Sequence, residues 1–147
     1  MAMVNQHGYE KDFYAWALEN AQLIRNGKFS EVDIKNVAEE LEDMGKSEKR
    51  QLVNRLAVLM GHLLKWEFQP QRRGNSWKNT IDHQRSRLKK LLNESPSLKN
   101  ELLERISEAY KDALFIASDE TGLPKEDFPQ DENYTLEQLL NDAFFPE

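Results

Sequence analysis

The sequence of 147 residues contains no cysteine. A disulfide, a thiol nucleophile, a thiolate zinc site and an iron–sulfur cluster are therefore excluded. Histidine is also scarce, and none of His7, His62 and His83 belongs to an H-x-x-x-H or E-x-x-H pair that would present two metal ligands from one helix. Glycine-rich phosphate loops are absent as well. We therefore predict no metal site and no cofactor.

Long apolar runs are missing too. No stretch approaches the roughly 18 apolar residues of a membrane-spanning helix, and the mean hydropathy is -0.79. The first residues do not form a charged and then apolar leader with a small-residue cleavage site. We therefore expect a soluble, cytoplasmic protein with no membrane partner.

The length is that of one ordinary domain, which buries roughly 70% of the surface that its unfolded chain exposes. We predict a flexible N-terminus over residues 1–8 and a single helical domain over residues 9–147. No strand-like alternation, internal repeat or low-complexity linker interrupts this range.

Apolar residues recur at helical spacing along the chain, and Gly27, Gly45 and Pro70 mark expected helix ends. The segment 47–68 has the widest apolar surface, so we expect it to be the most buried helix. A capping box that begins at Thr135 predicts a short C-terminal helix. The predicted fold class is all-α, a single-domain helical bundle of about five main helices plus this short helix.

One of the expected helices precedes Gly45 and carries a single apolar stripe. Its members follow the spacing i, i+3, i+4, i+7, and they are Ile34, Val37, Ala38, Leu41 and Met44.

The formal net charge of -6 hides a segregation of charge along the chain. Residues 1–48 carry 5 basic and 10 acidic side chains, residues 49–90 carry 11 and 2, and residues 91–147 carry 4 and 14. The basic middle segment could be a surface for anions or nucleic acid. The interpretation that we favour is internal docking, in which basic helices pack against acidic neighbours and the charges cancel.

Five segments of the chain carry a family resemblance, in the family's order and over nearly all of residues 9–147. They read YEKDFYAWALENAQLIRNGKFSEVDIKNVAEELEDMGKSEKR, HLLKWEFQP, SWKNTIDHQRSRL, SPSL and ASDETGLPKEDFPQDENYTLEQLL. The chain resembles the bacterial family known as domain of unknown function 29, which is abundant in cyanobacteria. The resemblance implies an all-helical bacterial domain, and it implies no activity, catalytic residue, cofactor or partner.

A set of polar residues lies on or beside the apolar stripes, where helix packing could bring them together. The set is Glu40, Asp43, Arg55, His62, Gln84 and Arg85. An acid, an imidazole and guanidinium groups in a partly dry cleft suffice for general acid–base chemistry or for anion binding. Alternatively, the same side chains pair with one another and hold adjacent helices together.

A second candidate site is the basic turn that follows Pro70. The cations that could bind an anion there are Lys65, Arg72, Arg73 and Lys78. However, Trp66 and Trp77 fall on apolar stripes, and a buried ring cannot stack on a base. Since no nucleic-acid-binding motif is present, we expect another kind of partner and keep nucleic-acid binding as the third hypothesis.

The C-terminal segment ends in an aromatic pair, Phe144 and Phe145. We expect this pair to cover the bundle, with a self-association contact as the alternative. The first functional hypothesis is therefore a non-enzymatic helical module that binds a protein partner or itself. The second is a small enzyme or anion-binding protein that uses the polar set.

Overall fold

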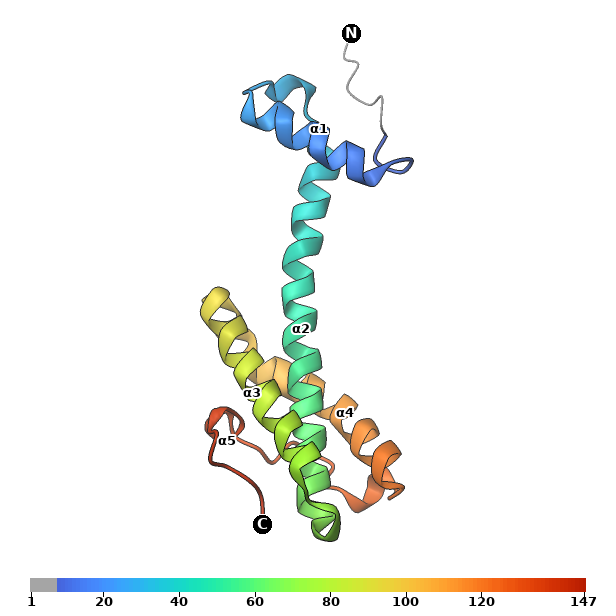
Figure 1. Cartoon of the computed structure of the whole chain (residues 1–147), viewed down its shortest axis with the longest axis vertical. Helices are drawn as coiled ribbons and strands as arrows, with labels where there is room; N and C mark the ends of the chain where they lie inside the picture. Colours follow the sequence, from blue (N-terminus) through green and yellow to red (C-terminus); the bar gives the residue numbers. More distant parts are fainter. Residues whose placement is uncertain (1–7) are drawn as a thin grey trace. The chain divides into compact units, whose positions relative to one another are not determined.

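The computed structural model describes residues 8–147, which form five α-helices and four short 3-10 helices (Figure 1). The α-helices are α1 (Phe13–Arg25), α2 (Ile34–Phe68), α3 (Asn75–Glu94), α4 (Leu102–Thr121) and α5 (Leu136–Leu140). The 3-10 helices are η1 (Phe29–Glu31), η2 (Pro70–Arg72), η3 (Pro96–Glu101) and η4 (Lys125–Asp127). Because residues 8–147 contain no strand, the all-α prediction is confirmed.

Helix ends follow local chemistry. Asp12 caps α1, because its carboxylate accepts a hydrogen bond from a backbone N–H of the first turn. Gly27 and Gly122 follow α1 and α4 with φ angles of 72° and 78°, a left-handed conformation that costs glycine little. The predicted capping box is confirmed, since Thr135 and Gln138 each accept from the other's backbone N–H at the start of α5.

Helix α2 is continuous over 35 residues, so the predicted helix end at Gly45 is wrong. Gly45 does not adopt the positive φ that Gly27 and Gly122 use to end their helices. A glycine inside a helix costs only about 1 kcal/mol relative to alanine. The residues on both sides of Gly45 are mostly glutamate, lysine and other good helix formers with no proline among them, so the helix continues.

The chain divides into two compact units, residues 1–47 and residues 48–147, which we call the N-terminal unit and the C-terminal unit. The N-terminal unit contains α1, η1 and the start of α2. Of its described residues only Trp16 and Asn20 are buried. Nε1 of Trp16 donates to Asp33 at 2.9 Å, and the side chain of Asn20 accepts from the backbone N–H of Asp33 at 2.7 Å. These bonds tie α1 to the loop before α2.

The C-terminal unit contains the main hydrophobic core. Ten residues of helix α2 between Leu52 and Lys65 are buried, and seven of them belong to this core, so the prediction that this segment is the most buried helix is confirmed. Helices α3 and α4 contribute four and seven residues to the core. At Gly61, α2 approaches α4 so closely that a Cβ atom would lie 2.9 Å from Cγ2 of Ile116.

The C-terminal segment covers this core, as predicted. The ring of Phe145 lies 4.9 Å from that of Trp66, and the ring of Phe144 lies 6.2 Å from that of Tyr134, measured between ring centres. Both phenylalanines are partly buried against the core.

Ion pairs join the basic middle segment to the acidic C-terminal segment within the C-terminal unit. Three such pairs are Lys49–Glu101 at 3.0 Å, Lys65–Glu120 at 2.9 Å and Lys89–Asp142 at 2.8 Å. They support the internal-docking interpretation for these two segments.

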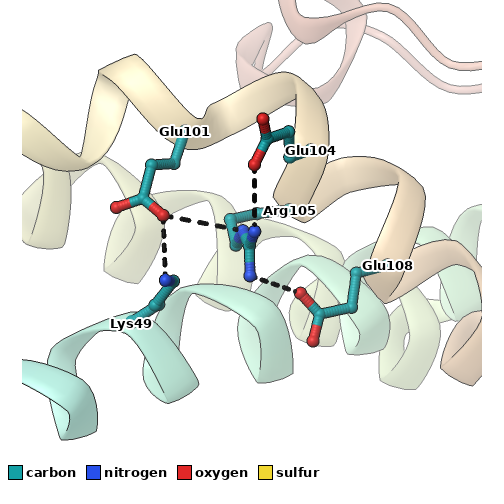
Figure 2. A network of polar contacts seen from close by, with 5 residues as sticks. All are labelled: Lys49, Glu101, Glu104, Arg105 and Glu108. Atoms are coloured by element: carbon teal, nitrogen blue, oxygen red, sulfur yellow. Dashed lines mark hydrogen bonds and ion pairs between the residues drawn. The ribbon is translucent and has the colours of Figure 1, made fainter.

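The first of these pairs belongs to a larger network that joins α2 to η3 and α4 (Figure 2). The guanidinium of Arg105 points between three carboxylates, at 2.7 Å from Glu108, 3.2 Å from Glu104 and 4.0 Å from Glu101. Lys49 approaches Glu101 from α2. The partly buried Arg105 (19% side-chain exposure) is thereby surrounded by its counter-charges.

Candidate functional site

Two of the predicted polar residues meet between α2 and α3. Nη1 of Arg55 donates to the amide oxygen of Gln84 at 3.2 Å. Beside them is a hollow of about 200 Å³, lined also by Gln51, Asn54 and Val58. This hollow offers one guanidinium to a small anion.

His62 belongs to a second, separate network. Its Nδ1 lies 3.0 Å from the backbone oxygen of Val58, and its Nε2 lies 3.3 Å from Nζ of Lys65. Lys65 also donates to Glu120 of α4 at 2.9 Å, although only 4% of its side chain is exposed. Burial lowers the pKa of His62, and the charge of Lys65 lowers it further. A neutral imidazole can accept a hydrogen bond from the ammonium, so the network is internally satisfied.

Arg85 is fully buried and holds the short helix α5. Its Nε donates to the backbone oxygen of Leu139 at 2.9 Å, and one of its terminal nitrogens donates to that of Gln138 at 3.1 Å. Both carbonyls lie at the C-terminal end of a helix, where intrahelical donors run out; that of Gln138 also accepts a longer bond, of 3.4 Å, from the backbone N–H of Asn141. Arg85 therefore has a structural role, because it supplies hydrogen bonds to the carbonyls at the end of α5.

The two acidic members of the set belong to the other unit. Glu40 accepts a hydrogen bond from the hydroxyl of Tyr9. This bond and the adjacent negative charges raise the pKa of Tyr9 to about 12. Asp43 is exposed on α2. Within the C-terminal unit the structure thus brings together Arg55 with Gln84, and it gives His62 and Arg85 other partners. A catalytic role for the set stays a prediction.

The four predicted anion-binding cations all lie over aromatic rings. Lys65 and Arg72 lie 4.8 Å and 5.7 Å from the ring centre of Trp77, Arg73 lies 5.2 Å from that of Trp66, and Lys78 lies 5.8 Å from that of Phe145. Such contacts favour a cation over the face of a ring.

Arg73 is further occupied by backbone oxygens. It donates to Trp66 at 2.6 Å, to Pro146 at 3.3 Å and to Glu147 at 3.1 Å. Arg72, in contrast, is exposed. Arg73 of the basic turn therefore binds the C-terminal segment.

The most apolar surface of the N-terminal unit was not among the sites predicted from the sequence. In the N-terminal unit a hollow of about 400 Å³ is lined only by apolar side chains, which we call the apolar hollow: Ile24, Phe29, Val32, Ile34, Val37, Ala38 and Leu41. The predicted stripe on α2 forms one wall of it. Its members Ile34, Leu41 and Met44 are 65%, 63% and 65% exposed. The helical spacing signalled this stripe, but spacing alone predicts a buried face.

Across residues 8–147, no three His, Asp or Glu side chains stand close enough to hold a metal ion. His7 lies outside the described residues, as do residues 1–7 of the predicted flexible N-terminus. The helices formed by the described residues include none with the length and hydropathy of a membrane span.

Comparison with known proteins identifies a family and no individual relative. No curated protein and no solved structure matches the chain. The family described as Domain of unknown function DUF29 matches residues 9–145, which confirms the resemblance seen in the sequence. The match spans both units and nearly the whole chain, so the protein belongs to the DUF29 family.

Proposed function

We propose that this protein is a non-enzymatic interaction module and that it binds another polypeptide through the apolar surface of its N-terminal unit. One observation carries the proposal. Ten large hydrophobic side chains are exposed in residues 8–147, and eight of them lie in the N-terminal unit. Four of these eight side chains line the apolar hollow together, and contiguous exposed apolar surface is characteristic of protein interaction sites.

The lining of the apolar hollow favours a polypeptide over a small molecule. Small-molecule sites combine apolar walls with a few polar groups that orient the ligand, and this hollow has no polar side chain in its lining. An amphipathic helix needs no such groups, since its apolar face fills a groove through side chains at helical spacing. The hollow is therefore suited to a helix.

The second hypothesis, a small enzyme or anion-binding protein, has less support. The side chains proposed for it are engaged elsewhere: Arg85 bonds the backbone of α5, His62 bonds Lys65, and Glu40 bonds Tyr9. Arg55 and Gln84 remain together beside a small hollow. One guanidinium without an adjacent acid or base supports anion binding and no proton transfer.

Site-specific photo-crosslinking tests the proposal. The photoreactive residue p-benzoylphenylalanine replaces Leu41 in the hollow or, as a matched control one residue away, the exposed Glu42. Irradiation of cells that produce the full chain should give one discrete protein adduct from position 41 and none from position 42. A Phe29→Ser change across the hollow should remove that adduct. No adduct from position 41, or equal adducts from both positions, would contradict the proposal.

A further inference from the structure

We infer that the polypeptide bound by the apolar hollow is a second copy of this chain, which pairs through the same surface to form a symmetric dimer. The inference rests on the proposed function and names its partner.

The stripe on α2 has the spacing of a helix that pairs with another helix. Ile34, Val37, Leu41 and Met44 are separated by three, four and three residues, which is the alternation of the a and d positions in a heptad repeat. Helix α2 continues through this region without a break. The stripe therefore presents a continuous apolar seam.

Most charged residues of this segment lie away from the seam. With Ile34 and Leu41 at a positions, the outward b, c and f positions hold most of the charges of the segment, namely Lys35, Glu39, Glu42, Asp43 and Lys46. The exception is Glu40, at a position beside the seam, and its carboxylate is bonded to Tyr9 of the same unit. An identical copy would therefore meet little like charge at the contact, although the whole unit is acidic.

The apolar surface has the two features that a self-complementary contact needs. It contains a hollow, and its walls carry large side chains that project into solvent, with Phe29 63% and Ile34 65% exposed. In a two-fold symmetric contact the same patch serves on both copies, so the projecting groups of each can enter the hollow of the other. No second kind of surface is required.

The small core of the N-terminal unit favours a partner that is always present. With only Trp16 and Asn20 buried among its described residues, this unit has very little core of its own. Units of this size usually need oligomerisation or another stabilising device. The C-terminal unit has only Leu103 and Phe115 as exposed large hydrophobic side chains. The N-terminal unit of a second copy, in contrast, has eight exposed large hydrophobic side chains, and the second copy is present at the same concentration as the first.

Multi-angle light scattering on the purified full chain tests the inference. We expect a particle of twice the chain mass. Leu41→Glu should raise the dimer dissociation constant by at least about 100-fold, since two buried leucines are lost per dimer. Met44→Glu is a second variant with the same expectation. Leu103→Glu is the matched control and should leave the dimer intact. All three side chains are 63–79% exposed, so circular dichroism should remain that of the native helical fold.

The outcomes separate this inference from the proposed function. A dimer that both seam variants preserve, or a chain that stays monomeric at about 100 μM, shows that a second copy does not occupy the apolar hollow and overturns the inference. If the chain is monomeric but position 41 crosslinks to a different protein, such as one with a basic amphipathic helix, the proposed function holds and only the identity of the partner is wrong. If position 41 gives no crosslink at all, both proposals fail.

Discussion

Replacing Gly45 by alanine should stabilise the protein, whereas the same change at Gly61, in the same helix, should leave it no more stable than the native chain or destabilise it. Both residues lie inside α2, where alanine is favoured over glycine by about 1 kcal/mol. At Gly45 no atom lies within 4 Å of the added Cβ. The free energy of unfolding should therefore rise by about 0.5–1 kcal/mol.

At Gly61 the added methyl group meets helix α4. Its Cβ would lie 2.9 Å from Cγ2 and 3.1 Å from Cβ of Ile116, and 3.4 Å from the backbone oxygen of Ala113. Overpacking of this kind costs about 1–3 kcal/mol, which offsets or exceeds the gain in helix propensity. The two alanine variants should therefore differ by about 1–3 kcal/mol, with Gly61→Ala the less stable.

Urea unfolding followed by circular dichroism measures both values, at one protein concentration because association shifts apparent stability. An Ile116→Ala background removes the opposing Cγ2 atom, so Gly61→Ala should cost less there than in the native background. If Gly61→Ala stabilises as much as Gly45→Ala, the close approach of α2 and α4 is refuted. If Gly45→Ala destabilises, α2 is interrupted at that glycine.

Three further predictions concern buried polar groups. Glu120→Gln should destabilise the protein by about 1–3 kcal/mol in urea unfolding, because it leaves the buried ammonium of Lys65 without its counter-charge. Adding Lys65→Met to this variant should recover part of the lost stability. If no stability is recovered, this account is wrong. Arg85→Met should speed hydrogen exchange in α5, since the carbonyl of Leu139 loses its donor; unchanged exchange there would show that α5 holds without it. The pKa of His62 is lowered in the folded state, so the unfolded chain takes up the proton more readily. The corresponding stability is present above pH 6.5 and is lost as the pH falls below it towards the lowered pKa. His62→Gln should therefore flatten the fall of the urea midpoint between pH 7 and pH 5, and an unchanged slope would contradict this assignment.

Local features of the fold could be predicted from the sequence because they depend on neighbours in the chain. The capping box at Thr135 needs only residues three apart, and the left-handed helix ends at Gly27 and Gly122 need only a residue without Cβ. Gly45 shows where this reasoning fails. A glycine permits a helix end without requiring one, and here the flanking residues carry the helix through.

The polar candidates show the same division between local and long-range information. Spacing placed Arg55 and Gln84 on or beside apolar stripes, and the two side chains do meet. It could not reveal that Lys65 would pair with Glu120, 55 residues away, because nothing near Glu120 distinguishes it from the other acidic residues of α4. Such partners depend on which helices pack together.

The sequence by itself determined the helical class, the apolar stripes and the segregation of charge, since periodicity and composition are properties of the chain alone. Only the tertiary structure decided which stripes are buried. The stripe after Leu52 lies in the core of the C-terminal unit, while the stripe from Ile34 to Met44 remains largely exposed. Identical spacing produced these opposite outcomes because burial requires a second apolar surface, and the presence of that surface depends on the packing of distant elements.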